Sequence, residues 1–90
     1  METRELRDLV SVGKATEEDF HRLEIYKVEE LVGRNADDLY NRLKALNGGA
    51  YLDMCVHDVF TCAIAQAENQ NLPDEQKQWW YWSKVRKAKK

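Results

Sequence analysis

Two short segments of this 90-residue chain carry residue types that can hold an anionic polymer. In the first, a turn precedes a helix, where backbone amides and a lysine ammonium can bind a phosphate; its candidate contact residues are Ser11, Val12, Gly13, Lys14 and Ala15. In the second, cations follow aromatic residues, a combination that can stack bases and neutralise a strand's backbone; its candidates are Lys84, Arg86 and Lys87, after Trp79-Trp80-Tyr81-Trp82. Both predict weak contact with nucleic-acid phosphates that does not read base sequence.

The first segment also has a purely structural interpretation. Glu17, Glu18 and Asp19 follow in or near the first helical turn, where carboxylates complement the helix dipole and repel a phosphate. One pair of like charges about 6 Å apart costs roughly 2 to 3 kcal/mol at an effective dielectric of about 20, comparable with one phosphate contact. The turn could instead only join two packed helices, with Gly13 supplying backbone freedom. A second turn, Val32-Gly33-Arg34, has the same two interpretations with weaker support for binding.

The aromatic run also has two interpretations. Adjacent aromatic residues point in different directions around a helix, and large aromatic side chains are mostly buried in proteins. We therefore expect at least one or two of Trp79, Trp80 and Trp82 to anchor the last helix on the core rather than to stack bases.

Charge is distributed unevenly along the chain. The formal net charge is -2, but residues 1–75 carry all sixteen acids and eight bases, whereas residues 76–90 carry six bases and no acid. The six bases are Lys77, Lys84, Arg86, Lys87, Lys89 and Lys90. The basic tail favours DNA phosphates as a partner, and the acidic body favours a basic protein. Both classes of partner stay open.

Patterns for catalysis, metals and membranes are weak. The sequence has no nucleophile elbow, glycine-rich phosphate loop or His-Glu-x-x-His motif. Asp53 and His57 are four residues apart on one helical face, but no second ligand cluster accompanies them. The N-terminus is charged, and no apolar stretch approaches the roughly 18 to 20 residues of a membrane span. We expect a cytoplasmic, non-enzymatic protein without metal, cofactor or membrane association.

The two cysteines, Cys55 and Cys62, lie seven positions apart in one predicted helix. That spacing separates their Cα atoms by ~10 Å, too far for a disulfide between them. We expect both to be buried, reduced thiols.

Helical periodicity predicts a single all-α domain over residues 1–90. It consists of two helical hairpin units of short helices at 1–25 and 26–47, a long buried helix at 50–68, and a tryptophan-rich helix at 74–86. The first short helix covers roughly 4–10, and Val28 to Val32 form the third. The predicted N-caps are Thr3, Thr16, Asn35 and Asp74. Asn47-Gly48-Gly49 stops the helix that Asn35 begins.

The two hairpin units match one another at an offset of twenty residues. Val12-Gly13 lies over Val32-Gly33, and Arg22-Leu23 lies over Arg42-Leu43. The match starts at each predicted turn, which favours a duplicated helix-hairpin-helix element packed as a pseudo-symmetric pair.

Several motifs resemble a family of short bacterial helix-hairpin-helix proteins, labelled "pathogenicity locus" or mitomycin-resistance-related. They are Leu6-Arg7-Asp8-Leu9-Val10-Ser11-Val12-Gly13-Lys14, Asp19-Phe20-His21-Arg22-Leu23-Glu24-Ile25, Val28-Glu29-Glu30-Leu31, Leu39-Tyr40-Asn41-Arg42-Leu43, Gly48-Gly49, Cys55, Cys62 and Trp79-Trp80-Tyr81-Trp82. That family is similar to the helical C-terminal domain of a competence regulator. The resemblance implies the fold firmly and DNA-phosphate binding by analogy.

Gly13 and Lys14 match the later glycine and the basic residue of DNA-binding hairpins. Three positions depart from that pattern. Ser11 stands where the first glycine is expected, Val10 replaces a proline, and Glu24 replaces the glycine before Ile25.

These features lead to three hypotheses. The first is a non-catalytic module that binds DNA weakly and without sequence preference. The alternative is a protein-interaction or scaffold domain without DNA contact. The third, raised by the family label, is a small-molecule binder or enzyme, and it requires a deep pocket lined by tryptophans, His57 and a carboxylate.

Overall fold

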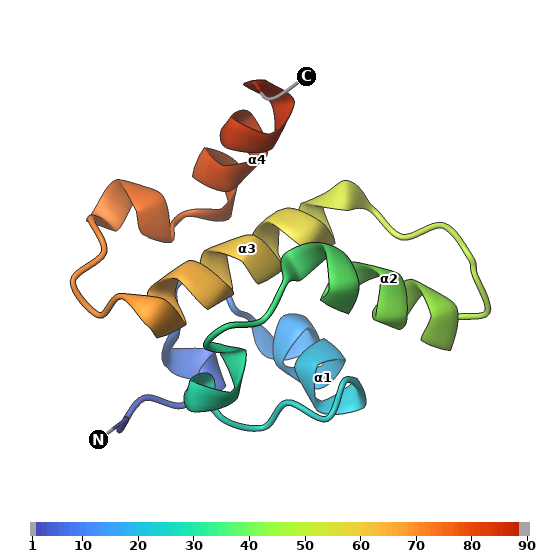
Figure 1. The fold of residues 1–90 in the computed structure, drawn as a ribbon, viewed down its shortest axis with the longest axis horizontal. Helices are drawn as coiled ribbons and strands as arrows, with labels where there is room; N and C mark the ends of the chain where they lie inside the picture. The colour runs from blue at the N-terminus through green and yellow to red at the C-terminus, as the bar shows by residue number, and fades with distance from the viewer. Residues whose placement is uncertain (1, 89–90) are drawn as a thin grey trace.

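The computed structural model describes residues 2–88, which form an all-α fold without a β-strand in that range. Its α-helices are α1 Lys14–Arg22, α2 Ala36–Leu46, α3 Met54–Glu68 and α4 Trp79–Ala88, and its 3-10 helices are η1 Leu6–Asp8, η2 Val28–Leu31 and η3 Asp74–Lys77. In Figure 1, α3 crosses the middle of the molecule, α2 runs beside it, and α4 leaves at a steep angle. The all-α prediction is confirmed. None of the described helices is both long and apolar enough to cross a membrane.

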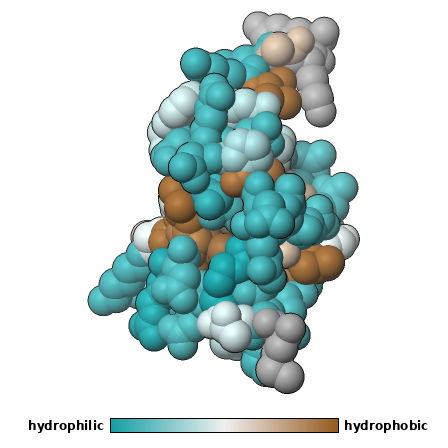
Figure 2. Space-filling view, turned by 90° about the vertical axis from the view of Figure 1, so that its left-hand side faces the viewer, coloured by the Kyte–Doolittle hydropathy of each residue, from teal (hydrophilic) through white to brown (hydrophobic). Residues whose placement is uncertain are grey.

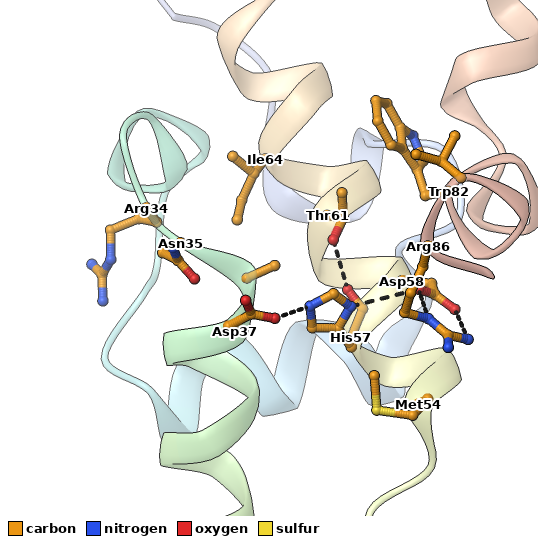
Figure 3. A pocket seen from close by; sticks show the side chains of 12 residues that line it. Arg34, Asn35, Asp37, Met54, His57, Asp58, Thr61, Ile64, Trp82 and Arg86 are labelled. Carbon is orange, nitrogen blue, oxygen red and sulfur yellow. Dashed lines mark hydrogen bonds and ion pairs between the residues drawn. The ribbon is translucent and has the colours of Figure 1, made fainter. Parts of the chain in front are cut away.

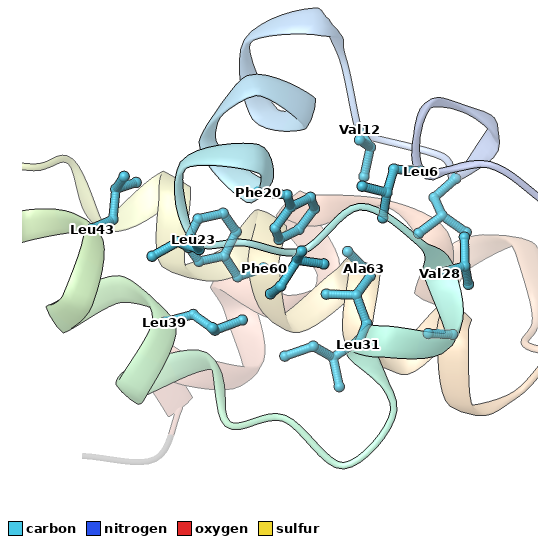
Figure 4. Packing of buried hydrophobic residues seen from close by; sticks show 14 residues of the cluster. Leu6, Val12, Phe20, Leu23, Val28, Leu31, Leu39, Leu43, Phe60 and Ala63 are labelled. Carbon is cyan, nitrogen blue, oxygen red and sulfur yellow. The ribbon is translucent and has the colours of Figure 1, made fainter. Parts of the chain in front are cut away.

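The hydrophobic core forms where α3 meets the N-terminal half of the chain. Phe20 of α1 and Phe60 of α3 are fully buried, and their ring centroids are 5.0 Å apart. Figure 4 shows leucine and valine side chains from η1, η2 and α2 converging on this pair. One core therefore includes residues from both predicted hairpin units and from α3.

Helix α3 is shorter than the predicted 50–68. It begins at Met54, because the Asp53 side chain accepts a hydrogen bond from the Cys55 amide and caps the helix. Ala50 to Leu52 form an irregular connection instead. Of the two free cysteines, Cys62 is buried as predicted, but Cys55 is exposed because it lies in the first turn, so the prediction was wrong for Cys55.

The predicted helices at 4–10 and 28–32 are only the short 3-10 helices η1 and η2. Apolar residues three apart, such as Leu6 and Leu9, fit a 3-10 turn as well as an α-helix, so their spacing did not distinguish the two. Thr3 is not the cap, since Glu5 precedes η1. Likewise α1 begins after Gly13, earlier than the predicted cap Thr16 allows.

The two hairpin units repeat in backbone conformation, but at an offset of twenty-two. Each 3-10 helix is followed by a left-handed residue, Ser11 at φ 73° and Gly33 at φ 79°, and then by the N-cap of an α-helix, Gly13 or Asn35. We call Val10-Ser11-Val12-Gly13 the first hairpin and Val32-Gly33-Arg34-Asn35 the second. Gly13 has φ -91°, which any residue can adopt, so the expectation that this position needs the backbone freedom of glycine was wrong. The sequence comparison paired Gly13 with Gly33 because both are glycine, but the residue that shares the left-handed conformation of Gly33 is Ser11.

Helices α1 and α2 end in the same way. In each, a left-handed residue follows the C-cap, Glu24 at φ 64° after α1 and Gly48 at φ 70° after α2. The next amide returns to the last turn, from Ile25 to Phe20 O at 2.8 Å and from Gly49 to Lys44 O at 2.9 Å. These are Schellman ends, which confirms the predicted stop after α2.

The last helix begins later than predicted. Asp74 opens η3, and α4 starts only at Trp79. Trp82 is half-buried and its indole N–H donates to Gln76 O at 2.7 Å, whereas Trp79 and Trp80 are 36% and 40% exposed. Trp82 therefore anchors the last helix as predicted, Trp79 and Trp80 are partly exposed, and the buried residue of α4 is Ser83.

Candidate nucleic-acid interface

The first hairpin is fixed by contacts from two distant elements. The buried Gln66 side chain of α3 accepts from Val10 N at 2.9 Å and donates to Val10 O at 2.8 Å. The Ser11 hydroxyl donates to Lys77 O at 3.2 Å and accepts from Trp79 N at 3.1 Å. The turn is thus fastened to α3 on one side and to the start of α4 on the other.

The N-terminus of α1 is exposed and lacks a capping side chain. Gly13, Lys14 and Ala15 are all exposed, and a Cβ built on Gly13 would meet no atom within 4 Å. Among residues 2–88, no side chain caps this helix. Because the first amides of an α-helix have no partner within the helix, the start of α1 offers donors to an external acceptor beside the Lys14 ammonium.

Ser11 and Val12 have other roles in this hairpin. Val12 is 6% exposed and its amide donates to Leu9 O at 3.2 Å, so it belongs to the core rather than to the exposed surface. The hydroxyl of Ser11 is engaged by Lys77 and Trp79. Of the five predicted contact residues here, Gly13, Lys14 and Ala15 remain accessible.

The carboxylates of α1 are less concentrated at its N-terminus than expected. Only Glu17 lies in the first turn. The Glu5 hydrogen bond, together with the charges of Glu5 and Glu17, raises the pKa of Arg7, which places a cation near Glu17. Burial raises the pKa of Asp19 in the following turn. In the first turn of α1 the repulsion of a phosphate therefore comes from Glu17, because Arg7 is already paired with Glu5.

The second hairpin already holds an anion of its own. The Gly33 amide donates to Glu68 Oε2 at 2.8 Å, and the Asn35 side chain accepts from Asp38 N at 3.1 Å. The latter bond confirms Asn35 as the predicted N-cap of α2. Two carboxylates, Asp37 and Asp38, lie in the first turn of α2. These contacts favour the structural interpretation of this hairpin.

The cations of α4 divide into two kinds. Lys84 and Lys87 are exposed, and Lys84 Nζ lies 5.0 Å from the ring centroid of Trp80. Arg86 instead pairs with buried Asp58 through two hydrogen bonds of 2.8 and 3.0 Å. The hydrogen bond to Asp58 raises the pKa of the Arg86 guanidinium. Arg86 therefore holds α4 on α3 and is not a free phosphate ligand, which corrects the prediction. Lys89 and Lys90 lie outside the described residues.

A groove of about 490 Å³ lies where α2, α3 and α4 meet. Trp82, His57 and Asp58 line it, as the small-molecule hypothesis requires, but Trp79 and Trp80 do not. Its charged groups pair with one another across the floor (Figure 3). His57 Nε2 lies 2.5 Å from Asp37 and its Nδ1 lies 3.5 Å from Asp58, which binds Arg86. These pairs join the three helices, whereas Arg34, which also lines the groove, forms no ion pair with a described residue.

Metal ligation is not favoured by the geometry of Asp53 and His57. Asp53 is occupied as the cap of α3, and His57 faces Asp37. Within residues 2–88, no group of three or more His, Cys, Asp or Glu side chains is placed to hold a metal ion.

Gln66 is the positioning residue that the sequence analysis missed. It is 3% exposed, and besides Val10 it contacts Cys62 O and Sγ. A buried amide must find hydrogen-bond partners, so a lone glutamine within the apolar stretch 63–67 was the available signal. It could not have indicated Val10, which is 56 positions away.

Comparison with known proteins identifies the family. Residues 1–88 match the family described as "Pathogenicity locus". The mitomycin resistance protein McrB of Streptomyces lavendulae is 35% identical over 83 residues, which cover 92% of this chain and 74% of that protein. No solved structure matches the chain. With the family match extending from the first helical turn through α4, the chain belongs to the pathogenicity locus family.

Proposed function

We propose that this chain is a non-catalytic module that binds the DNA backbone weakly and without sequence preference at the first hairpin. One observation carries the proposal, namely the uncapped and exposed start of α1 beside Lys14. Amides at a helix N-terminus and a nearby ammonium complement a phosphate but read no base.

The contrast with the second hairpin supports this assignment. The same backbone conformation there is occupied by Glu68 and capped by Asn35. The Gly33 amide that holds Glu68 corresponds to the Ser11 amide of the first hairpin, whereas the start of α2, capped by Asn35, corresponds to the start of α1. The start of α1 has no capping side chain among residues 2–88, which supports an external phosphate as the acceptor for its amides.

One face of the molecule gives little support to the protein-interaction alternative. Figure 2, viewed from the side where the chain turns from α3 into η3, shows hydrophilic surface interrupted by small hydrophobic patches. A large continuous apolar patch, which would favour a stable protein interface, is not seen on this face. A basic protein bound through the acidic residues is the outcome to consider if DNA does not bind.

The test is a titration of a short, fluorescently labelled duplex, followed by anisotropy at low and at physiological salt. We expect association that weakens as salt rises, because bound phosphates release counterions. Lys14→Glu is expected to weaken it on the order of tenfold, since it removes one phosphate contact and adds a repulsive charge. Arg34→Glu, the matched charge reversal in the second hairpin, should have a much smaller effect. Undetectable association at low salt, or equal losses in the two variants, would overturn the proposal.

A further inference from the structure

The first turn of α4 is attached to the first hairpin. A single hydroxyl, Ser11 Oγ, bonds both Lys77 O and the Trp79 amide, which are the residues on either side of the bend between η3 and α4. Cys62 reinforces the joint, because its thiol donates to Lys77 O at 2.9 Å. The tryptophan-rich end of α4 is therefore held beside the turn that leads to Lys14.

Large apolar side chains are exposed on both sides of this joint. Val10 in the hairpin is 38% exposed, and Trp79 and Trp80 at the start of α4 are 36% and 40% exposed. The remaining tryptophan, Trp82, turns to the groove instead. The indoles of Trp79 and Trp80 are partly covered and keep the rest of their surface available for a ligand.

Trp80 also carries a cation at its ring. Lys84 Nζ, one helical turn after Trp80, lies over one face of the ring at 5.0 Å from its centroid, so a base stacks on the other face or displaces the ammonium. An aromatic surface that can stack a base, next to a cation that can neutralise the adjoining phosphate, is the combination used to hold unpaired strands. Stacking is tolerant of sequence, in keeping with a hairpin that reads no base.

We propose that the preferred ligand is single-stranded DNA, with a phosphate at the start of α1 and unpaired bases on the exposed indoles of Trp80 and Trp79. The inference rests on the proposed function and deepens it. A duplex keeps its bases stacked and paired, so an indole reaches them only after unpairing, whereas a single strand presents its base faces freely.

The experiment compares a labelled oligothymidine with a duplex of equal length, at the same salt, for the wild type and for Trp80→Ala. We expect the single strand to bind about tenfold more tightly than the duplex, the magnitude of one stacked base. Trp80→Ala should remove most of this preference, while Trp80→Phe should retain part of it. Tyr51→Ala is the matched control, because Tyr51 is an aromatic residue 84% exposed on the connection before α3. Circular dichroism of each variant checks folding.

The outcomes separate the two proposals. Equal affinity for single strand and duplex, with both weakened by Lys14→Glu, overturns the single-strand inference and leaves the proposed function standing. A preference that survives both Trp80→Ala and Trp79→Ala overturns the role of the indoles. Single-strand binding that depends on Trp80 but not on Lys14 overturns the hairpin site while supporting the stacking surface. No association with either DNA overturns both.

Discussion

The two hairpins have nearly the same backbone and very different surroundings. Both place a left-handed residue two positions before the N-cap of an α-helix. The second is closed by Asn35 and Glu68, whereas the first leaves the start of α1 exposed. Main-chain conformation therefore does not determine whether a helix start is capped, and the side chains around its amides do.

Two residues of α3 attach the hairpins in different ways. Gln66 is buried, neutral, and bonds both the amide and the carbonyl of Val10. Glu68 is exposed and charged, and its carboxylate accepts a hydrogen bond from the amide of Gly33. The neutral side chain holds the first hairpin without occupying the helix start, while the charged one gives the second hairpin an internal anion.

The largest expected effect comes from removing the attachment of the first hairpin. Gln66→Ala leaves the Val10 amide and carbonyl without their partners and should lower the free energy of unfolding by about 2 to 3 kcal/mol. Glu68→Gln keeps an acceptor for Gly33 at an exposed position and should change it by less than about 0.5 kcal/mol. Urea denaturation of both variants measures the difference. Similar losses would show that the two attachments are equivalent.

The next effect distinguishes the two glycines that the sequence comparison had paired. Gly33→Ala places a Cβ at φ 79° and should cost about 1 to 2 kcal/mol of unfolding free energy. Gly13→Ala, at φ -91° with open space around it, should cost less than about 1 kcal/mol, the difference between glycine and alanine as N-caps. Thermal unfolding provides the measurement, and a greater loss for Gly13→Ala would contradict the assignment of the left-handed position.

A third change makes the end of α1 resemble the end of α2. Glu24 is exposed and left-handed where α2 has Gly48, so Glu24→Gly should raise the free energy of unfolding by about 1 kcal/mol. For a domain of this size that corresponds to roughly 4 to 8 °C in Tm. The reverse change, Gly48→Ala, should lower stability by a similar amount. A Tm that stays the same in Glu24→Gly would mean that Glu24 is not strained.

The smallest expected change in stability comes from giving the first hairpin the N-cap residue of the second. Gly13→Asn introduces the cap of α2 at a position whose backbone already has N-cap geometry, so stability should change by only a few tenths of a kcal/mol. DNA affinity should fall severalfold, since the new side chain competes with phosphate for an amide of α1. Anisotropy and urea denaturation on the same sample test both parts. Undiminished affinity would contradict binding at these amides.

Local features of the sequence were read with the most success. Asn35 caps α2 and Gly48 ends it as predicted, because capping depends on residues within one turn. The apolar character of residues 54–68 correctly indicated the central helix. The short 3-10 helices and the offset between the hairpins were misjudged, since spacing and identity do not report backbone dihedral angles.

The candidate site was only partly predictable. Gly13, Lys14, Ala15, Lys84 and Lys87 are accessible as the hypothesis requires. Val12 and Arg86 have the right residue types, but one packs in the core and the other neutralises Asp58. Trp79 and Trp80 keep 36% and 40% of their surface exposed, which the general tendency of large aromatic side chains to be buried did not indicate.

The sequence by itself determined the all-α class, the Asn35 cap and the glycine end of α2, and the uneven charge, all of which depend on neighbouring residues or on composition. Only the tertiary structure decided which helix start stays open. Gln66 lies 56 positions from Val10, Glu68 lies 35 from Gly33, and Ser11 lies 68 from Trp79. Hydrogen bonds over such separations form only after the chain has packed, so no local pattern could assign an internal anion to one hairpin and an exposed aromatic surface to the other.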